Sequence, residues 1–321
     1  MTILAAGTRL LLMGRSSSAS VINTAVGTPP RFDASVVNAS VRTPGGDFLE
    51  YRFPNAMAEL WAHFDSMFEA TLGSVFYVDL IDASGNTVAA IRADSTWSVQ
   101  IRSGTGSLSN RGNIGTQNGA LTTIDVHYVG GANWTFEAWQ NGAPWFSLSG
   151  TSGPTNNPVA IRLRSPTFGG TFTNFSQFAL ADADDLRGRK FGSCVLTGTG
   201  HYNDGTGAPA DTGDGNFATG KALAAAGNRF LGTKPAYTVP MGMVVGAVAV
   251  NAFVRAGGAV PNARIITRTG GVDGQEANLS PAPAVDYSAR SRILTTNPAT
   301  GLPFDESSFN ATDFGIEARP A

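Results

Sequence analysis

The stretch "TTIDVHYVGGANWTFEAWQNGAPWFSLSG" (residues 122–150) indicates the fold class most directly. It contains runs rich in Thr, Val and aromatic residues, which favour β-strands. Short turn signals separate these runs, at Gly130-Gly131 and at Asn141-Gly142. Gly and Asn readily take the positive φ angles that tight hairpin turns require. The stretch therefore predicts a meander of antiparallel strands.

This meander holds three of the chain's five tryptophans, Trp134, Trp139 and Trp145. Because side chains alternate along a strand, Trp134 is expected on one face with Phe136, and Trp139 on the other. Rings so placed could fill the core or pack across the hairpin, contact another subunit, or stack on a sugar. Trp139, Trp145 and the turn residue Asn141 are the candidate ligand or subunit contacts.

The same pattern continues through most of the chain. From Phe32 onward, short apolar runs alternate with Gly, Asn, Asp and Pro at spacings near ten residues, which is typical of a sandwich or jelly roll. In "FYVDLIDASGNTVAAIR" (residues 76–92) a hairpin is expected, with its turn at Ser84-Gly85-Asn86. A Gly-rich segment at 181–216 separates two such regions.

The fold class is therefore predicted to be all-β, with two β-sandwich (jelly-roll-like) domains in tandem. The boundaries are 1–185, including an N-terminal strand or arm, and 186–321, an assembly or interaction domain. In the N-terminal segment, residues 2–14 hold two apolar clusters that a chain would not leave in water. This segment is expected to be either a strand of the first sandwich or an arm ordered on assembly.

One stretch does not fit a strand by periodicity. In "NAMAELWAHFDSMFEA" (residues 55–70) the apolar residues fall at helical spacing, and Asn55 is a plausible N-cap. Taken alone, the spacing predicts a helix.

Composition excludes several classes of protein. Charged residues make up only 14% of the 321 residues and the net charge is −2, so there is no electrostatic footprint for nucleic acid. The single cysteine excludes an intrachain disulfide. The longest apolar stretch, Met241–Val254, is shorter than the roughly 20 residues that a membrane-spanning helix needs.

Motifs that carry chemistry are scarce. His63, His127 and His201 are far apart in the sequence, and no hydrolase, nucleotide-binding or paired-glutamate motif occurs. Catalytic, cofactor and metal residues are therefore expected to be absent, and the protein is expected not to be an enzyme. Calcium is the one metal that acidic loops of this chain could hold, although solvated turns are the simpler interpretation. The loop residues are Asp182, Asp184, Asp185, Asp204, Asp211 and Asp214.

Two further stretches accompany the meander. They are "FSQFALADADDLRGRKF" (residues 175–191), with its exit Asp184 to Gly188, and the C-terminal "TTNPATGLPFDESSFNATDFGIEARPA" (residues 295–321). Together with the meander they resemble the concanavalin A-like (laminin G-like) jelly rolls in virion proteins of tailed bacteriophages. The resemblance implies that "AELWAHFD" (residues 58–65) is a strand and that a short turn of helix precedes the closing strand. The E-x-D-x-E pattern of the glucanase members is absent, which argues against hydrolysis.

The resemblance implies a non-enzymatic structural component of a tailed-phage virion. The protein would be tail-associated, as a fibre, collar or minor tail protein, and made in the bacterial host cytoplasm. Its partners would be other virion proteins and further copies of itself. The alternatives are a carbohydrate-binding module that recognises a host surface glycan, and a capsid decoration protein. An exposed, coplanar Trp139/Trp145 pair in a groove would favour glycan binding, and burial of those rings under another subunit would favour assembly.

Overall fold

The computed structural model describes residues 3–7, 14–15, 20–22, 40–44, 48–68, 75–93, 97–115, 122–164, 172–189, 194, 196–209, 220–256, 262–279 and 288–320. The chain divides into two compact units, Met1–Phe191 and Gly192–Ala321. Nearly all of the secondary structure in these ranges is strand, which confirms the predicted all-β class. None of the helices in these ranges has the length and apolar character to cross a membrane.

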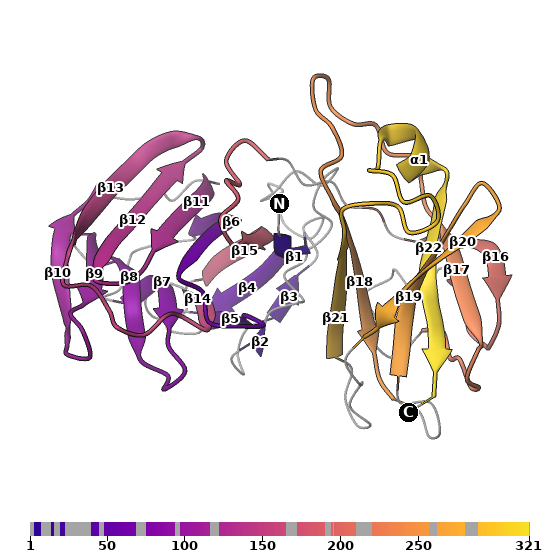
Figure 1. The fold of residues 1–321 in the computed structure, drawn as a ribbon, viewed down its shortest axis with the longest axis horizontal. Coiled ribbons are helices and arrows are strands. Elements are labelled where there is room, and N and C mark those ends of the chain that lie inside the picture. Colours follow the sequence, from indigo (N-terminus) through magenta and orange to yellow (C-terminus); the bar gives the residue numbers. More distant parts are fainter. Residues whose placement is uncertain are drawn as a thin grey trace. The chain divides into compact units, whose positions relative to one another are not determined.

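The first unit contains two antiparallel sheets (Figure 1). The strands of the larger sheet are β1 (Ile3–Gly7), β3 (Ser20–Ile22), β4 (Ser40–Pro44), β6 (Glu59–Phe68), β11 (Thr122–Val129), β12 (Asn133–Gln140), β13 (Ala143–Thr151) and β15 (Phe172–Ala181). Their order is β13-β12-β11-β6-β15-β4-β3, and β1 also pairs with β15.

The strands of the smaller sheet are β2 (Gly14–Arg15), β5 (Phe48–Arg52), β7 (Val75–Ile81), β8 (Thr87–Ala93), β9 (Ser98–Arg102), β10 (Leu108–Asn113) and β14 (Ala160–Arg164). Their order is β10-β9-β8-β7-β14-β5-β2.

The hairpins predicted from turn residues are confirmed. β11 pairs with β12 and β12 with β13, so residues 122–151 form the expected meander. Asn141 and Gly142 turn the second hairpin at φ 51° and 78°, and the amide and side-chain oxygen of Asn141 both bond Thr123. The β7–β8 hairpin turns at Gly85, whose φ is 81°. Each turn lies in the left-handed region that Gly and Asn tolerate.

Both sheets contribute to one apolar core in this unit. Aromatic rings meet edge-on inside it: Tyr77 contacts Trp97 at 5.5 Å and Phe64 at 5.9 Å between ring centroids. The largest fully buried side chains of the described chain all belong to this unit: Trp97, Tyr77, Tyr128, Phe64, Phe136, Phe175, Phe178, Leu49, Leu60, Leu80 and Ile81. The core therefore has the layered form of a sandwich.

The segment with helical spacing is strand β6, so the periodicity is misleading there and the strand implied by the resemblance is confirmed. Leu60 and Phe64 point into the core, and the alternate residues Trp61, His63 and Asp65 are also buried. A strand covered on both faces has apolar residues at spacings that also fit a helix.

The N-terminal residues Ile3–Gly7 form β1, which pairs antiparallel with β15 from Phe178 to Ala181. For the beginning of the N-terminal segment 2–14, the structure therefore has a strand of the first sandwich rather than an arm. Residues 8–13 lie outside the described residues.

The second unit has a sheet of β16 (Gly198–Asn203), β17 (Arg229–Thr233), β19 (Asn262–Thr269), β20 (Val272–Asn278) and β22 (Thr312–Arg319). Its order is β16-β17-β22-β19-β20, and β18 (Val248–Val254) and β21 (Ser288–Leu294) form a separate pair. A small apolar cluster is built on Leu294, Phe304 and Phe314.

The helix expected before the closing strand is α1 (Glu306–Asn310), drawn in yellow in Figure 1. Asp305 caps it, because its carboxylate accepts from the Ser308 amide at 2.6 Å while the Ser308 hydroxyl accepts from the Asp305 amide at 2.9 Å. This reciprocal capping box explains why so short a helix begins there.

Candidate functional site

A row of polar side chains crosses the outer face of the larger sheet in the first unit. Ser147 on β13 donates to Glu137 on β12 at 2.6 Å, and Glu137 lies 3.2 Å from Nδ1 of His127 on β11. The other ring nitrogen of His127, Nε2, lies 3.0 Å from Glu59 on β6. The strand register aligns Ser147 with Glu137 and Glu137 with His127, so the row follows directly from pairing.

His127 is held between two carboxylates. Since a carboxylate only accepts, both contacts are hydrogen bonds when both ring nitrogens carry protons. The pKa of Glu137 is held below its usual value, first by the Ser147 hydroxyl and also by His127, against an opposing effect of burial. The Glu59 side chain is 39% exposed, so the row reaches solvent at this end.

Two tryptophans stack beside this row. Trp61 lies 4.2 Å from the His127 ring and 5.4 Å from Trp139, measured between ring centroids, and both pairs are stacked. The guanidinium of Arg187 lies over the pair, 4.4 Å from the centroid of Trp139 and 5.3 Å from that of Trp61. Under this cover Trp61 is only 6% exposed and Trp139 only 8%.

Arg187 comes from the segment that leaves the last strand of the sheet. Arg187 donates to both carboxylate oxygens of Asp185, from Nε to Oδ1 at 3.0 Å and from Nη2 to Oδ2 at 2.5 Å. Burial acts to raise the pKa of Asp185, but the hydrogen bonds and charge of Arg187 outweigh it and lower the pKa. Both side chains are 43% exposed, whereas Leu186 between them is buried. The backbone is therefore anchored at Leu186, and the arginine head lies at the surface.

A second set of polar pairs lies deeper on the same face. His63 contacts Asp125 at 2.7 Å, and Thr123 donates to Asp65 at 2.7 Å. Burial is the largest influence on Asp65 and raises its pKa. His63, Asp65 and Asp125 are almost fully buried, so we assign them to the support of the sheet rather than to ligand contact.

The structure separates the residues that the sequence proposed as contacts. Trp139 lies on the face opposite Trp134 and Phe136, as predicted, where it stacks on Trp61. Trp145 instead packs against the core through Trp97, at 5.4 Å between centroids, and donates to the Gly115 carbonyl. The side-chain oxygen of Asn141 accepts from the Thr123 amide, which closes a turn. No coplanar Trp139/Trp145 pair is formed among these contacts.

The acidic loops are partly described. The Asp182 carboxylate accepts from the Ala183 amide, and Asp204 accepts from the Arg229 amide, as turn residues do. Asp211 and Asp214 lie outside the described residues. In the ranges that the structure covers, no group of three or more His, Cys, Asp or Glu residues is arranged to hold a metal. The prediction that these loops are solvated turns, with calcium binding as the alternative, stays a prediction.

Comparison with known proteins gives a fold likeness only. No protein family matches the sequence, and no curated protein matches it. Among solved structures, an endo-beta-1,4-glucuronan lyase from the fungus Trichoderma reesei is similar, with 11% identity, coverage of 57% of this chain and 96% of that one, and a TM-score of 0.44. The alginate lyase Aly36B has 11% identity, coverage of 52% and 97%, and a TM-score of 0.36.

A carbohydrate esterase of the Shiga toxin-encoding bacteriophage phi24B has 14% identity, coverage of 56% and 97%, and a TM-score of 0.37. These similar structures are all-β jelly rolls, and the names of the three describe carbohydrate-active proteins. A concanavalin A or phage-tail family is not shown.

The prediction that the protein is not an enzyme is wrong as an inference from the sequence. Lyases and an esterase occur among the similar jelly rolls, so the lack of a familiar catalytic motif does not separate this chain from enzymes. The prediction failed because a sheet assembles its side chains by strand register, which short linear motifs do not reveal.

Sequence reasoning also missed how residues converge on this face. Trp61, His127 and Arg187 are distant in sequence and carry no motif. The available signal was alternation: in "HYVGGANWTFEAW" (residues 127–139), His127, Glu137 and Trp139 fall on the strand positions that do not face the core.

Proposed function

We propose that the first unit binds a neutral carbohydrate on the outer face of its larger sheet, at the Trp61–Trp139 pair. The observation that carries this proposal is the stacked aromatic pair lying beside carboxylates and a hydroxyl on the same surface. Aromatic faces pack on the apolar side of a sugar ring, while carboxylates accept from its hydroxyl groups.

Charge favours a neutral ligand. Glu59, Glu137 and Asp185 surround the aromatic pair, and the Arg187 guanidinium nearby is already engaged by Asp185. An anionic sugar would face like charges there. The exposed Glu59 carboxylate is the accessible acceptor for a hydroxyl group.

The sugar would stack where the Arg187 guanidinium now lies. Arg187 is bonded to Asp185 two residues away, in the same exposed turn, so its side chain can swing aside without disturbing the sheet. A cation–π contact at an exposed site is worth about 0.5–1 kcal/mol, which a ligand can readily replace.

Glycan arrays followed by titration calorimetry test this proposal. Trp139→Ala should weaken binding of the selected neutral oligosaccharide by about tenfold, because the stacking surface is lost. Arg187→Ala should strengthen it by roughly two- to fivefold, because the competing cation is removed. Arg189→Ala, on the same exposed turn, is the matched control and should change nothing. A Trp139→Ala variant that stays folded and binds as well as the parent would refute the proposal.

A second candidate function is cleavage of the bound carbohydrate. His127 lies between Glu59 and Glu137, an arrangement suited to moving a proton, with one carboxylate orienting the ring. If this row is catalytic, the wild type should release new sugar ends from the bound glycan. Glu59→Gln should abolish release while retaining binding. If the glycan binds tightly and no product forms, cleavage is contradicted and carbohydrate binding is the function that is left.

For the location of the protein, we propose the virion of a tailed phage, attached to the tail, with a host surface glycan as the ligand. The resemblance of residues 124–191 and 295–321 to virion jelly rolls supports this. Cryo-electron microscopy of the particle tests it: density at the tail is expected, density on the capsid would indicate decoration, and absence from the particle would contradict it. Analytical ultracentrifugation tests the expected homo-oligomer.

A further inference from the structure

One face of the five-stranded sheet in the second unit gathers arginines. In the register, Arg229 on β17 and Arg264 on β19 both align with Glu317 on the central strand β22. Arg319 lies two residues beyond Glu317 on β22, and Arg268 lies four residues beyond Arg264 on β19. Both therefore face the same side of the sheet as Glu317. Since alternate residues share a face, four of the seven arginines of this unit lie on one side of the sheet.

Glu317 is saturated by three of these arginines. Nη2 of Arg264 donates to both carboxylate oxygens at 3.0 and 2.9 Å, Nε of Arg229 donates at 3.1 Å, and Nη1 of Arg319 at 2.9 Å. A carboxylate offers about four acceptor positions, so these bonds fill them. The Glu317 side chain is only 2% exposed. It therefore cannot balance any further positive charge.

Asp273 on β20 is the second carboxylate of this face. It accepts from the Tyr202 hydroxyl at 2.5 Å and from Arg268, whereas its contact with Nη1 of Arg229 is long, 3.4 Å. Asp313, opposite Arg268 in the register, is the third. Of the four arginines, Arg229 is the least firmly engaged at its terminal nitrogens, because its Nη1 contact with Asp273 is the longest of these bonds.

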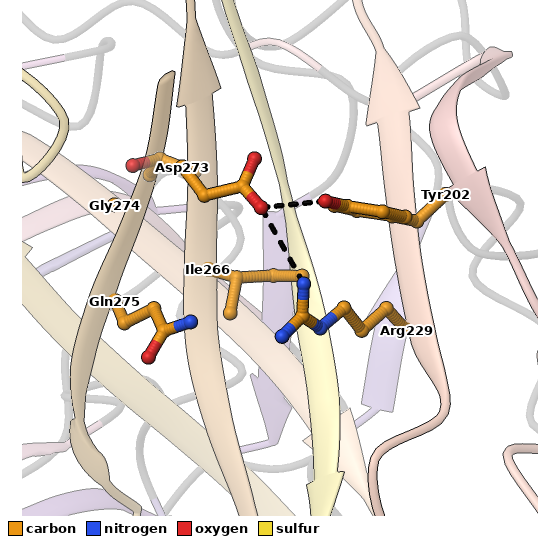
Figure 2. A pocket seen from close by; sticks show the side chains of 7 residues that line it. Tyr202, Arg229, Ile266, Asp273, Gly274 and Gln275 are labelled. Atoms are coloured by element: carbon orange, nitrogen blue, oxygen red, sulfur yellow. Dashed lines mark hydrogen bonds and ion pairs between the residues drawn. The ribbon is translucent and has the colours of Figure 1, made fainter. Parts of the chain in front are cut away.

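A shallow surface depression lies at this point (Figure 2); it encloses no space for a water molecule, so a ligand would lie over it rather than within it. Tyr202, Arg229, Asp273 and Gln275 line it, with Ile266 in its floor. Figure 2 shows the second terminal nitrogen of Arg229 and the amide nitrogen of Gln275 pointing toward each other across the depression. Both are hydrogen-bond donors, and an acceptor oxygen between them would satisfy both.

We propose that this depression binds a carboxylate group of a small acid or an acidic sugar, held between Arg229 and Gln275. One carboxylate oxygen would accept from the terminal nitrogen of Arg229 and from the Gln275 amide. Arg229 can exchange its long contact with Asp273 for the ligand, whose carboxylate matches the planar guanidinium. The site lies in a different unit from the proposed carbohydrate face and does not depend on it.

Titration of the full chain with sodium glucuronate, in a buffer low in chloride, tests the proposal. Glucuronate should bind, and its uncharged methyl ester should bind at least tenfold more weakly, because the ester carbonyl still accepts a hydrogen bond but has no charge to pair with Arg229. Gln275→Ala should weaken glucuronate binding by about tenfold, and Arg229→Gln by at least as much. Arg255→Gln removes the same charge from an exposed position outside the cluster and should leave affinity unchanged.

Three results would overturn the proposal. They are equal affinity for glucuronate and its ester, unchanged affinity in Gln275→Ala, and tighter binding of inorganic phosphate than of glucuronate. If Arg229→Gln fails to fold, Gln275→Ala still decides, since Gln275 is exposed on an edge strand. Trp139→Ala should not alter glucuronate affinity, which separates this site from the one in the first unit.

Discussion

In the first unit, both sheets contribute to one apolar cluster that fills the space between them. Trp97 and Trp134 belong to this cluster, and Trp145 packs against it. In the described part of the second unit, the apolar cluster is built on Leu294, Phe304 and Phe314, and a nearly buried glutamate holds three arginines on the opposite face of the sheet. Both units are all-β and both bury some carboxylates, but the first has the larger apolar cluster and the second has three arginines on one glutamate.

The difference matters because the two kinds of interaction respond to different conditions. Apolar burial contributes roughly 25 cal/mol per Å² and is insensitive to pH. An ion-pair network depends on the ionisation of its carboxylates and is disrupted when one member is removed. Conveniently, all five tryptophans lie in the first unit, so their fluorescence reports on that unit while circular dichroism reports on both.

Replacing Phe64 by Ala should have the largest effect. Phe64 is fully buried and contacts Tyr77 and Phe175, so the variant should lose about 3–5 kcal/mol of unfolding free energy through lost burial and a cavity. Urea titration followed by tryptophan fluorescence measures it. The exposed Leu302→Ala in the second unit serves as the control. A loss under about 1 kcal/mol would show that the core repacks.

Glu317→Gln should affect the second unit nearly as strongly. It leaves three guanidinium groups without their shared charge, and breaking a buried ion pair from one side costs about 3–5 kcal/mol, reduced here because the arginines are partly exposed. The circular dichroism transition should split, while the fluorescence transition stays in place. Glu276→Gln, at a partly exposed pair 3.9 Å long, is the matched control. A coincident shift of both transitions would contradict the separate roles of the units.

Acid should act in opposite directions on Glu317 in the second unit and on Asp65 and Asp79 in the first. Burial raises the pKa of Glu317, but its hydrogen bonds to Arg264 and Arg319 and the charges of the arginines lower it more, to below the ordinary 4.5. Its stabilisation is then fully present above pH 4.5 and is lost as pH falls through the depressed folded value. In the first unit, burial raises the pKa of Asp65 and Asp79, so their protonation on acidification favours the folded state.

Comparing wild type with Glu317→Gln between pH 7 and pH 3 measures this effect. The stability difference between the two proteins should shrink below about pH 4.5. A difference that stays constant across the range would mean that Glu317 does not gain stability from its charge.

Gly142→Ala should give the smallest change. Gly142 has φ 78°, and a Cβ added there would meet open space, so the cost is the left-handed backbone alone, about 1 kcal/mol. The fluorescence midpoint should move slightly to lower urea. Gly115→Ala in the same unit, where φ is not positive and an added Cβ would meet only Trp145 Nε1 at 4.0 Å, should leave stability nearly unchanged. Equal effects of the two substitutions would contradict the role of the turn.

The sequence predicted what is locally encoded. Alternating apolar residues around Gly85 and around Asn141-Gly142 specify hairpins, because turn chemistry and strand pattern lie within one short segment. Strand β6 was ambiguous, since Trp61 and His63 are buried on the face that usually meets water. Its pattern therefore lacks the polar alternation that distinguishes a strand.

The candidate sites could not be predicted in the same way, because they depend on which strands become neighbours. Trp139 meets Trp61 because β11 pairs with both β6 and β12, which brings these two strands to either side of it. Likewise, Arg264 meets Glu317 through the pairing of β19 with β22. Such non-local pairing is invisible to periodicity.

The pairing of β1 with β15 has a consequence for biosynthesis. Ile3 and Ala181 are partners, so during translation β1 has no partner strand until nearly the whole first unit has left the ribosome. Contacts this distant in sequence make folding slow, because loop closure is costly before the pairing stabilises the sheet. Until then the free edge of the sheet is open to other chains. The order of translation, rather than the stability of the finished fold, therefore sets when this unit is most vulnerable to aggregation.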